Sequence, residues 1–114
     1  MGIKFVEKND TLIVKIKGEL DHHTSDLFKD AINTEYQKGF KNIILDFEKL
    51  NFMDSSGIGM ILGRYKMAKD NNGKLAIVGA NSQLLKVIEL SGILRIINCY
   101  DTIEEAIKNM QRGI

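Results

Sequence analysis

The sequence contains one cysteine and no proline among its 114 residues. The single Cys99 cannot form a disulfide within the chain, and its apolar surroundings predict a place in the core. A chain without disulfides is typical of a reducing compartment, so we expect a cytoplasmic protein. Because proline is absent, no cis-prolyl isomerisation should slow folding.

Long apolar runs and blocks of a single charge are also missing. No apolar run approaches the roughly 20 residues of a membrane span, and charges appear from Lys4 onward, too early for a secretory signal peptide. The net charge is +1, with acidic and basic residues spread along the chain, and no basic block is flanked by aromatic residues. We therefore expect no nucleic-acid partner and no membrane partner.

What the chain does contain is the composition of an ordinary globular protein, with 44% hydrophobic and 27% charged residues. Its length suffices for one hydrophobic core. No linker, repeat or low-complexity segment interrupts it, so residues 1–114 are expected to form a single domain.

The first part of the chain has the pattern of an antiparallel hairpin. Residues 3–7 are extended, residues 8–10 provide a turn, and apolar residues alternate over 12–17 with a set that is more polar. Residues 18–23 are expected to form a loop or a short strand.

Strands and helices alternate after the hairpin. Strands are expected over 42–47, 74–78 and 96–100. Helices are expected from a cap at Thr24 or Ser25 up to Gly39, over 56–69, over 82–90, and after the capping box of Thr102 and Glu105. The order predicts an α/β domain with about four helices and a mixed sheet, in which the later strands are mostly parallel.

Apolar residues at helical spacing indicate which faces of these helices are buried. The predicted buried residues are Leu27, Phe28, Ala31 and Ile32 in the first helix, Ile58, Ile61, Leu62, Tyr65 and Ala68 in the second, and Ile103, Ala106, Ile107 and Met110 in the last.

The most informative segment is Met53-Asp54-Ser55-Ser56-Gly57-Ile58-Gly59, which opens the helix at 56–69. It presents two hydroxyls at a helix N-terminus, where free backbone N–H groups and the helix dipole favour negative charge. A serine here can be a cap, a nucleophile or a phosphate acceptor. As a cap, Asp54 or Ser55 would accept from the N–H groups of the first turn, which is worth about 1 kcal/mol.

Two enzymatic interpretations fit this segment poorly. A hydrolase elbow centred on Ser55 requires glycine where Met53 stands, and the two histidines, His22 and His23, lie before the first helix. A G-x-G-x-x-G loop requires glycine where Leu62 stands, and no P-loop motif occurs. A small-ligand or nucleotide-binding α/β domain that uses the same helix start remains the alternative.

Asp21, His22 and His23 are adjacent and invite a metal-binding interpretation. Adjacent side chains rarely converge on one ion, and no C-x-x-C or H-x-x-x-H spacing occurs. We expect an exposed loop here, with no metal ion and no bound cofactor.

Three glycines in the second helix, Gly57, Gly59 and Gly63, need a reason, because glycine inside a helix costs about 1 kcal/mol relative to alanine. They either let the helix pack closely on the sheet or form a flat patch that another protein approaches. The sequence by itself favours packing.

The chain resembles the anti-sigma factor antagonists of the STAS-domain family over nearly its whole length. The matching segments are Gly18-Glu19-Leu20-Asp21-His22-His23-Thr24, Ile44-Leu45-Asp46-Phe47, Phe52-Met53-Asp54-Ser55-Ser56-Gly57-Ile58-Gly59, Ile61-Leu62-Gly63-Arg64-Tyr65, Ser91-Gly92-Ile93 and Thr102-Ile103-Glu104-Glu105-Ala106.

This resemblance implies a non-enzymatic switch. The unphosphorylated protein would bind an anti-sigma factor serine kinase and release the sigma factor, the kinase would phosphorylate Ser56, and a serine phosphatase would reverse the modification. The resemblance and the glycine-rich first turn together imply these partner-binding residues: Asp21, Asp54, Ser55, Ser56, Gly57 and Gly59. Gly63 is expected to serve packing. The sporulation branch of the family is the nearer match, and the stress-response branch stays open.

Overall fold

The structure is a computed structural model and describes residues 2–112. Its elements follow one another in this order: β1 (Gly2–Lys8), β2 (Thr11–Leu20), α1 (Ser25–Tyr36), β3 (Asn42–Asp46), β4 (Leu50–Met53), α2 (Ser55–Asp70), β5 (Leu75–Val78), α3 (Ser82–Ser91), the 3₁₀ helix η1 (Ile93–Arg95), β6 (Asn98–Tyr100) and α4 (Ile103–Arg112).

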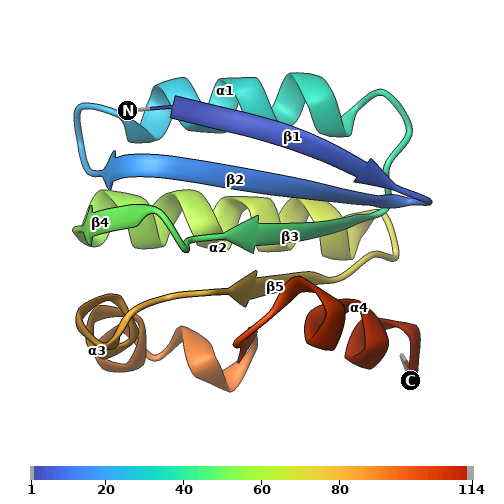
Figure 1. Cartoon of the computed structure of the whole chain (residues 1–114). Helices are drawn as coiled ribbons and strands as arrows, with labels where there is room; N and C mark the ends of the chain where they lie inside the picture. Colours follow the sequence, from blue (N-terminus) through green and yellow to red (C-terminus); the bar gives the residue numbers. More distant parts are fainter. Residues whose placement is uncertain (1, 113–114) are drawn as a thin grey trace.

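The six strands form one mixed sheet in the order β1-β2-β3-β5-β6, and β4 pairs with β2 beside this path (Figure 1). Strands β1 and β2 form an antiparallel hairpin, whereas every other pairing is parallel. The expected α/β fold with an N-terminal hairpin and four α-helices is confirmed.

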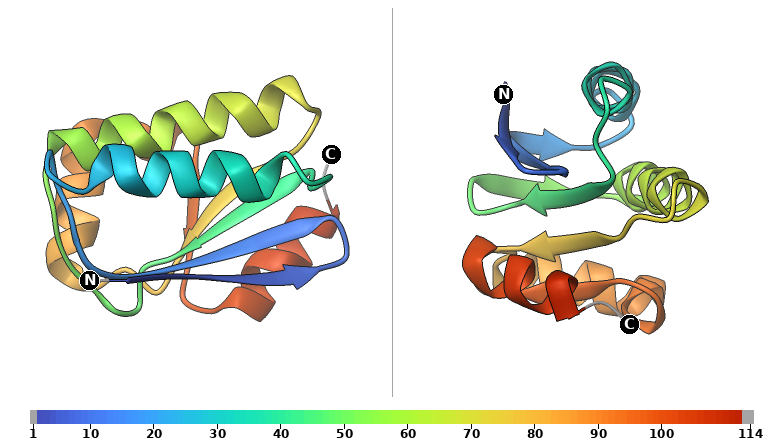
Figure 2. Two further views of the ribbon diagram at one scale, coloured as in Figure 1. Left: turned by 90° about the horizontal axis from the view of Figure 1, so that it is seen from above. Right: turned by 90° about the vertical axis from the view of Figure 1, so that its right-hand side faces the viewer.

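Helices cover both faces of the sheet, but unequally. Helices α1 and α2 lie side by side on one face, and α4 lies on the other (Figure 2). The larger core lies on the first side and includes Leu12 and Val14 of β2, Phe28 of α1, Ile61 of α2 and Leu84 of α3. A smaller core joins the opposite side of β2, β3 and β5 to Ala106 of α4. Burial on both faces explains why these strands are apolar almost throughout.

Three elements differ from the expectations. Strand β2 continues to Leu20 through residues that were expected to form a loop or a short strand. Strand β4 was missed, because it has four residues and only its two ends, Leu50 and Met53, are buried. The 3₁₀ helix η1 was also missed, and β6 is confined to Asn98–Tyr100.

The buried faces of the first two long helices also need correction. Leu27 is 58% exposed and Leu62 is 37% exposed, although both were expected in the core. Arg64 occupies a buried position of α2 instead. Apolar spacing misled here because the spacing rule assigns charged residues to the surface, whereas the Arg64 side chain, including part of its guanidinium group, is buried.

The helix caps predicted from the sequence are present in part. Thr102 accepts from the backbone N–H of Glu105 at 3.1 Å, as a capping residue should. Thr24 occupies the N-cap position of α1 but makes no capping hydrogen bond, because its hydroxyl donates to the carbonyl oxygen of Glu19.

Cys99 is half-buried against the larger core. Within residues 2–112, no helix is both long enough and apolar enough to cross a membrane.

Candidate functional site

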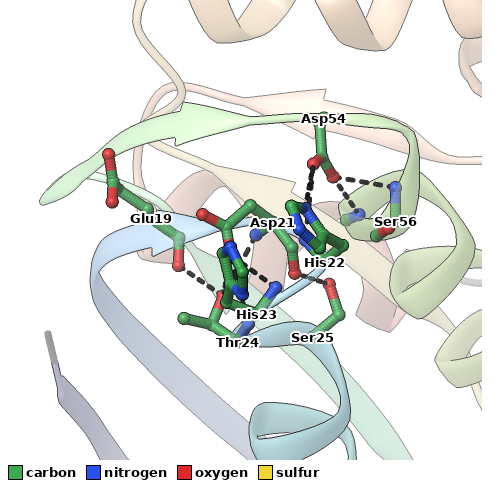
Figure 3. A network of polar contacts seen from close by, with 9 residues as sticks. Glu19, Asp21, His22, His23, Thr24, Ser25, Asp54 and Ser56 are labelled. Atoms are coloured by element: carbon green, nitrogen blue, oxygen red, sulfur yellow. Dashed lines mark hydrogen bonds and ion pairs between the residues drawn. The ribbon is translucent and has the colours of Figure 1, made fainter.

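The site is built where β2 and β4 end beside each other. The two strands are parallel and Leu20 pairs with Met53, so the loop after β2 and the start of α2 emerge at the same edge of the sheet. The backbone N–H of Asp54 donates to the carbonyl oxygen of Leu20 at 3.3 Å, which continues this pairing by one residue. Residues more than 30 positions apart in the chain thus form one surface (Figure 3).

Asp54 is the N-cap of α2. Its backbone is extended, and its Oδ1 accepts from the backbone N–H groups of Ser56 at 2.9 Å and Gly57 at 3.4 Å. Of the two caps considered, Asp54 is confirmed, whereas Ser55 is the first helical residue. The capping carboxylate also places a negative charge at the positive end of the helix dipole, where it is stabilising.

Asp54 also ties the two loops together. Its Oδ2 accepts from the backbone N–H of His22 at 3.3 Å and lies 3.7 Å from Nδ1 of the same residue. The His22 side chain is otherwise exposed, in agreement with an exposed loop. Asp54 therefore fixes the start of α2 and its neighbouring loop with one carboxylate.

Asp21 orders the loop before α1. Its Oδ1 accepts from the backbone N–H groups of His23 at 2.9 Å and Thr24 at 3.1 Å. Desolvation raises the pKa of Asp21, but these hydrogen bonds outweigh it, so the pKa lies below its ordinary value. The aspartate thus accepts hydrogen bonds from the backbone of its own loop (Figure 3).

The two serines differ in exposure. Ser55 is exposed, and Ser56 is half-buried beside α1. Neither hydroxyl donates to a histidine or a carboxylate among the described residues, and His22 faces Asp54 instead. The arrangement lacks the nucleophile–base contact on which serine hydrolysis depends. What it offers is an accessible hydroxyl at the N-terminus of a helix.

Two of the three glycines of α2, Gly57 and Gly63, have different roles from those expected. Gly57 is buried, and a Cβ there would lie 2.6 Å from Cγ of Met53 and 2.7 Å from the carbonyl oxygen of Leu20. The expectation that Gly57 belongs to an exposed surface is therefore wrong, because it lets α2 approach β2 and β4. A Cβ at Gly63 would meet nothing within 4 Å, so the packing role expected for Gly63 is also wrong.

Gly59 is exposed, and a Cβ there would also meet nothing within 4 Å. Together with Ser55 and Leu62 it forms an exposed stripe on the first two turns of α2, which we call the outer face of α2. Phe52, at 48% exposure, lies just before the same helix. Sequence reasoning missed both apolar residues. The spacing of 55, 59 and 62 was the available signal, since these positions share one side of a helix.

No group of three or more histidine, cysteine, aspartate or glutamate side chains is arranged to hold a metal ion within the described part of the chain. Asp21 accepts from the backbone of its own loop, at His23, whereas His22 contacts Asp54 at the start of α2.

Comparison with known proteins assigns the chain to a family. Residues 3–106 match the model of the STAS domain. Among proteins of known name, the anti-sigma F factor antagonist of Paenibacillus polymyxa is 36% identical over 97% of this chain and 96% of its own length. The anti-sigma-B factor antagonist of Staphylococcus aureus is 30% identical over 70% of this chain and 74% of its own.

Solved structures agree. The unphosphorylated form of the anti-sigma factor antagonist SpoIIAA matches with a TM-score of 0.74 and 30% identity, over 99% of this chain and all of that one. The phosphorylated form of the Bacillus protein SpoIIAA matches with a TM-score of 0.73 and 32% identity, over 96% and 99%. The chain therefore belongs to the STAS-domain family and groups within it with the anti-sigma factor antagonists.

Proposed function

We propose that this protein is an anti-sigma factor antagonist whose binding is switched off by phosphorylation of Ser56. The unphosphorylated form binds an anti-sigma factor that is also a serine kinase, and the bound sigma factor is released. The kinase transfers the γ-phosphoryl group of ATP to the Ser56 hydroxyl, leaving ADP, and the modified protein dissociates. A serine phosphatase removes the phosphate. The protein itself supplies no catalysis and acts in the cytoplasm.

The observation that carries this proposal is the position of Ser56 in the first turn of α2, two residues after the cap at Asp54. The second pKa of a phosphoserine is about 6, so the phosphate brings a charge of about −1.5 to −2 at neutral pH. At a helix N-terminus such a charge is tolerated or favours the fold by about 0.3–1 kcal/mol. Phosphorylation is therefore expected to change the surface and to leave the fold intact.

The proposed partner surface consists of the loop after β2 and the outer face of α2. Asp21 and Asp54 hold its backbone, and Ser55, Ser56 and Gly59 form the part that the kinase approaches. Gly57 contributes only through packing. A phosphate on Ser56 would add negative charge beside the Asp54 carboxylate. A like-charge contact at an interface costs several kcal/mol, which corresponds to roughly a thousandfold loss of affinity.

The decisive experiment is intact-mass spectrometry after incubation with the anti-sigma kinase and ATP. We expect one added phosphate, located to Ser56 by peptide mapping. Ser56→Ala should abolish the modification and give lasting binding, whereas the matched variant Ser55→Ala should still be modified. Phosphate on Ser55, or none despite stable binding of the kinase, would contradict the proposal.

A second measurement tests the electrostatic mechanism. Ser56→Asp should weaken binding to the kinase while the unfolding midpoint stays close to that of the unmodified protein. Binding as tight as that of the wild type would contradict the mechanism. We favour a kinase that controls a sigma F-type factor over one that controls a sigma B-type factor, because the identity to the sigma F relative is higher and covers nearly the whole chain.

A further inference from the structure

A groove runs between α1 and α2 beside Ser56. Its volume is about 330 Å³, and the residues that line it include Ser25 and Lys29 of α1 and Ser56, Met60 and Arg64 of α2. The two helices lie side by side along its length (Figure 2). His22, Ser25 and Ser56 lie together at the end of the groove formed by the two helix starts (Figure 3).

Arg64 is the unusual residue of this groove. It is only 8% exposed, and its Nε and Nη1 atoms are buried without a hydrogen-bond partner among the described residues. An arginine remains charged at neutral pH, and a buried charge without a partner is costly. Burial lowers the pKa of the guanidinium, and the electrostatic effect of Asp30 opposes this. A group with negative charge and several acceptor oxygens would satisfy these two nitrogen atoms.

The other charged groups around the groove do not supply that counterpart. The carboxylate of Asp26 lies 3.6 Å from the ammonium of Lys29, and Asp54 faces His22. Asp30 is exposed and forms no ion pair with Arg64 within 4 Å. Arg64 and Lys29 thus bring two cationic groups to the groove.

We propose that the groove binds the phosphate monoester group of phosphorylated Ser56 through the Arg64 guanidinium and the Lys29 ammonium. The inference rests on the proposed function, in that Ser56 is taken as the residue that carries the phosphate. Arginine suits this role because its planar fork of donors matches phosphate oxygens. The groove would hold the phosphate in one position on the surface that the partner recognises.

The helix geometry permits this contact. Ser56, Met60 and Arg64 are spaced four residues apart, so they follow one ridge of α2. Eight residues correspond to about 12 Å along the axis, and a long helical side chain points back toward the N-terminus. The Arg64 side chain therefore extends along this ridge in the direction of Ser56, and both residues line the groove. Lys29 lies across the groove, where its contact with Asp26 draws it toward the first turn of α1.

The test measures the second pKa of the phosphate by ³¹P NMR titration. Phosphoserine is introduced at position 56 during translation, so the kinase is not needed. Opposite charges nearby favour the dianion, so Arg64→Gln should raise this pKa by about one unit relative to wild type. The matched control Lys66→Gln removes a charge from an exposed site on the same helix and should leave it unchanged. If Arg64→Gln does not fold, Lys29→Gln replaces it as the test variant. Because Lys29 lies at the surface, this variant should raise the second pKa of the phosphate by a smaller amount.

A second arm separates phosphate on Ser56 from free phosphate. Inorganic phosphate is titrated into the unphosphorylated protein at constant ionic strength while the Nε–H resonance of Arg64 is followed. One outcome is that the second pKa of phosphoserine 56 is equal in all variants, while inorganic phosphate shifts the Arg64 Nε–H resonance saturably. If Arg64→Gln also abolishes binding of inorganic phosphate, the groove binds free phosphate and not the phosphate on Ser56. Equal pKa values without such a shift would overturn the inference. Failure of the kinase to modify Ser56 would contradict the proposed function and would leave both measurements unaffected.

Discussion

Asp54 and His22 are 32 positions apart in the chain, yet the Asp54 carboxylate accepts from the backbone N–H of His22 at 3.3 Å. The same side chain caps α2 through Ser56. A single residue thereby joins the helix that carries the proposed phosphate acceptor to the loop after β2. Removing it should affect both the helix and the loop.

Asp54→Ala is expected to lower the free energy of unfolding by about 1 kcal/mol, because the first turn of α2 loses its cap. Asp54→Asn keeps an acceptor oxygen without the charge, so it should lose much less. Urea unfolding followed by circular dichroism measures both. Equal losses in the two variants would mean that the charge, and not the capping hydrogen bond, stabilises the helix start.

Alanine in place of the three glycines of α2 should have opposite effects on stability. Gly57→Ala should be destabilising by about 1–3 kcal/mol, since its Cβ would overlap Met53 and Leu20 in a packed site. Gly59→Ala and Gly63→Ala meet open space and should stabilise the helix by about 0.5–1 kcal/mol each.

Thermal unfolding of the three variants under one condition makes this comparison directly. A stabilising Gly57→Ala would show that α2 can move away from β2 and β4. Gly59→Ala serves a second purpose in kinase binding, because a loss of affinity without a loss of stability would identify the outer face of α2 as a contact surface.

Asp21 gives a prediction about acid stability. Its pKa in the folded protein is below the ordinary value of 3.8, so the folded state favours the ionised carboxylate. The contribution to stability is therefore complete above pH 3.8 and disappears as the pH falls through the lower folded value.

Asp21→Asn keeps an acceptor and removes the charge, so it should be less stable than wild type at neutral pH and converge with it in acid. Unfolding midpoints measured for both proteins from pH 7 downward test this. If the difference between the two unfolding midpoints stays constant over the whole pH range, the charge of Asp21 does not contribute to stability.

Cys99 should react slowly with thiol reagents in the folded protein. Burial raises the pKa of its thiol, so less of the reactive thiolate is present at a given pH. Labelling with a chromogenic disulfide at pH 8 should be slow in buffer and fast in urea. Rapid labelling in buffer would indicate that the end of the sheet at β6 opens readily.

Many of the helices and strands could be predicted from local patterns in the sequence. The two-residue alternation of β2, the apolar run of β3 and the Thr102 cap of α4 each produced the expected element. The start of α2 was also correctly expected, because an aspartate before two serines is a strong capping sequence.

Other features depend on contacts that sequence patterns do not contain. Strand β4 exists because β2 offers a free edge beside it, and its exposed Asn51 and Phe52 break any alternation. Arg64 is buried where α2 lies beside α1, although an arginine in a helix is most simply expected at the surface. The roles of Gly57 and Gly63 were exchanged because their surroundings are set by elements distant in the chain.

Strand β2 has β1 on one side and β3, then β4, on the other. Its pairing with β1 closes over a turn of two residues, but its pairing with β3 and β4 must close loops of roughly 30 residues. The loop after β2 and the start of α2 meet only when those distant pairings form. The composite surface is thus a property of chains that have finished folding. A partner that recognises this composite surface would bind fully folded molecules and would not bind partly folded ones. Recognition would therefore also act as quality control.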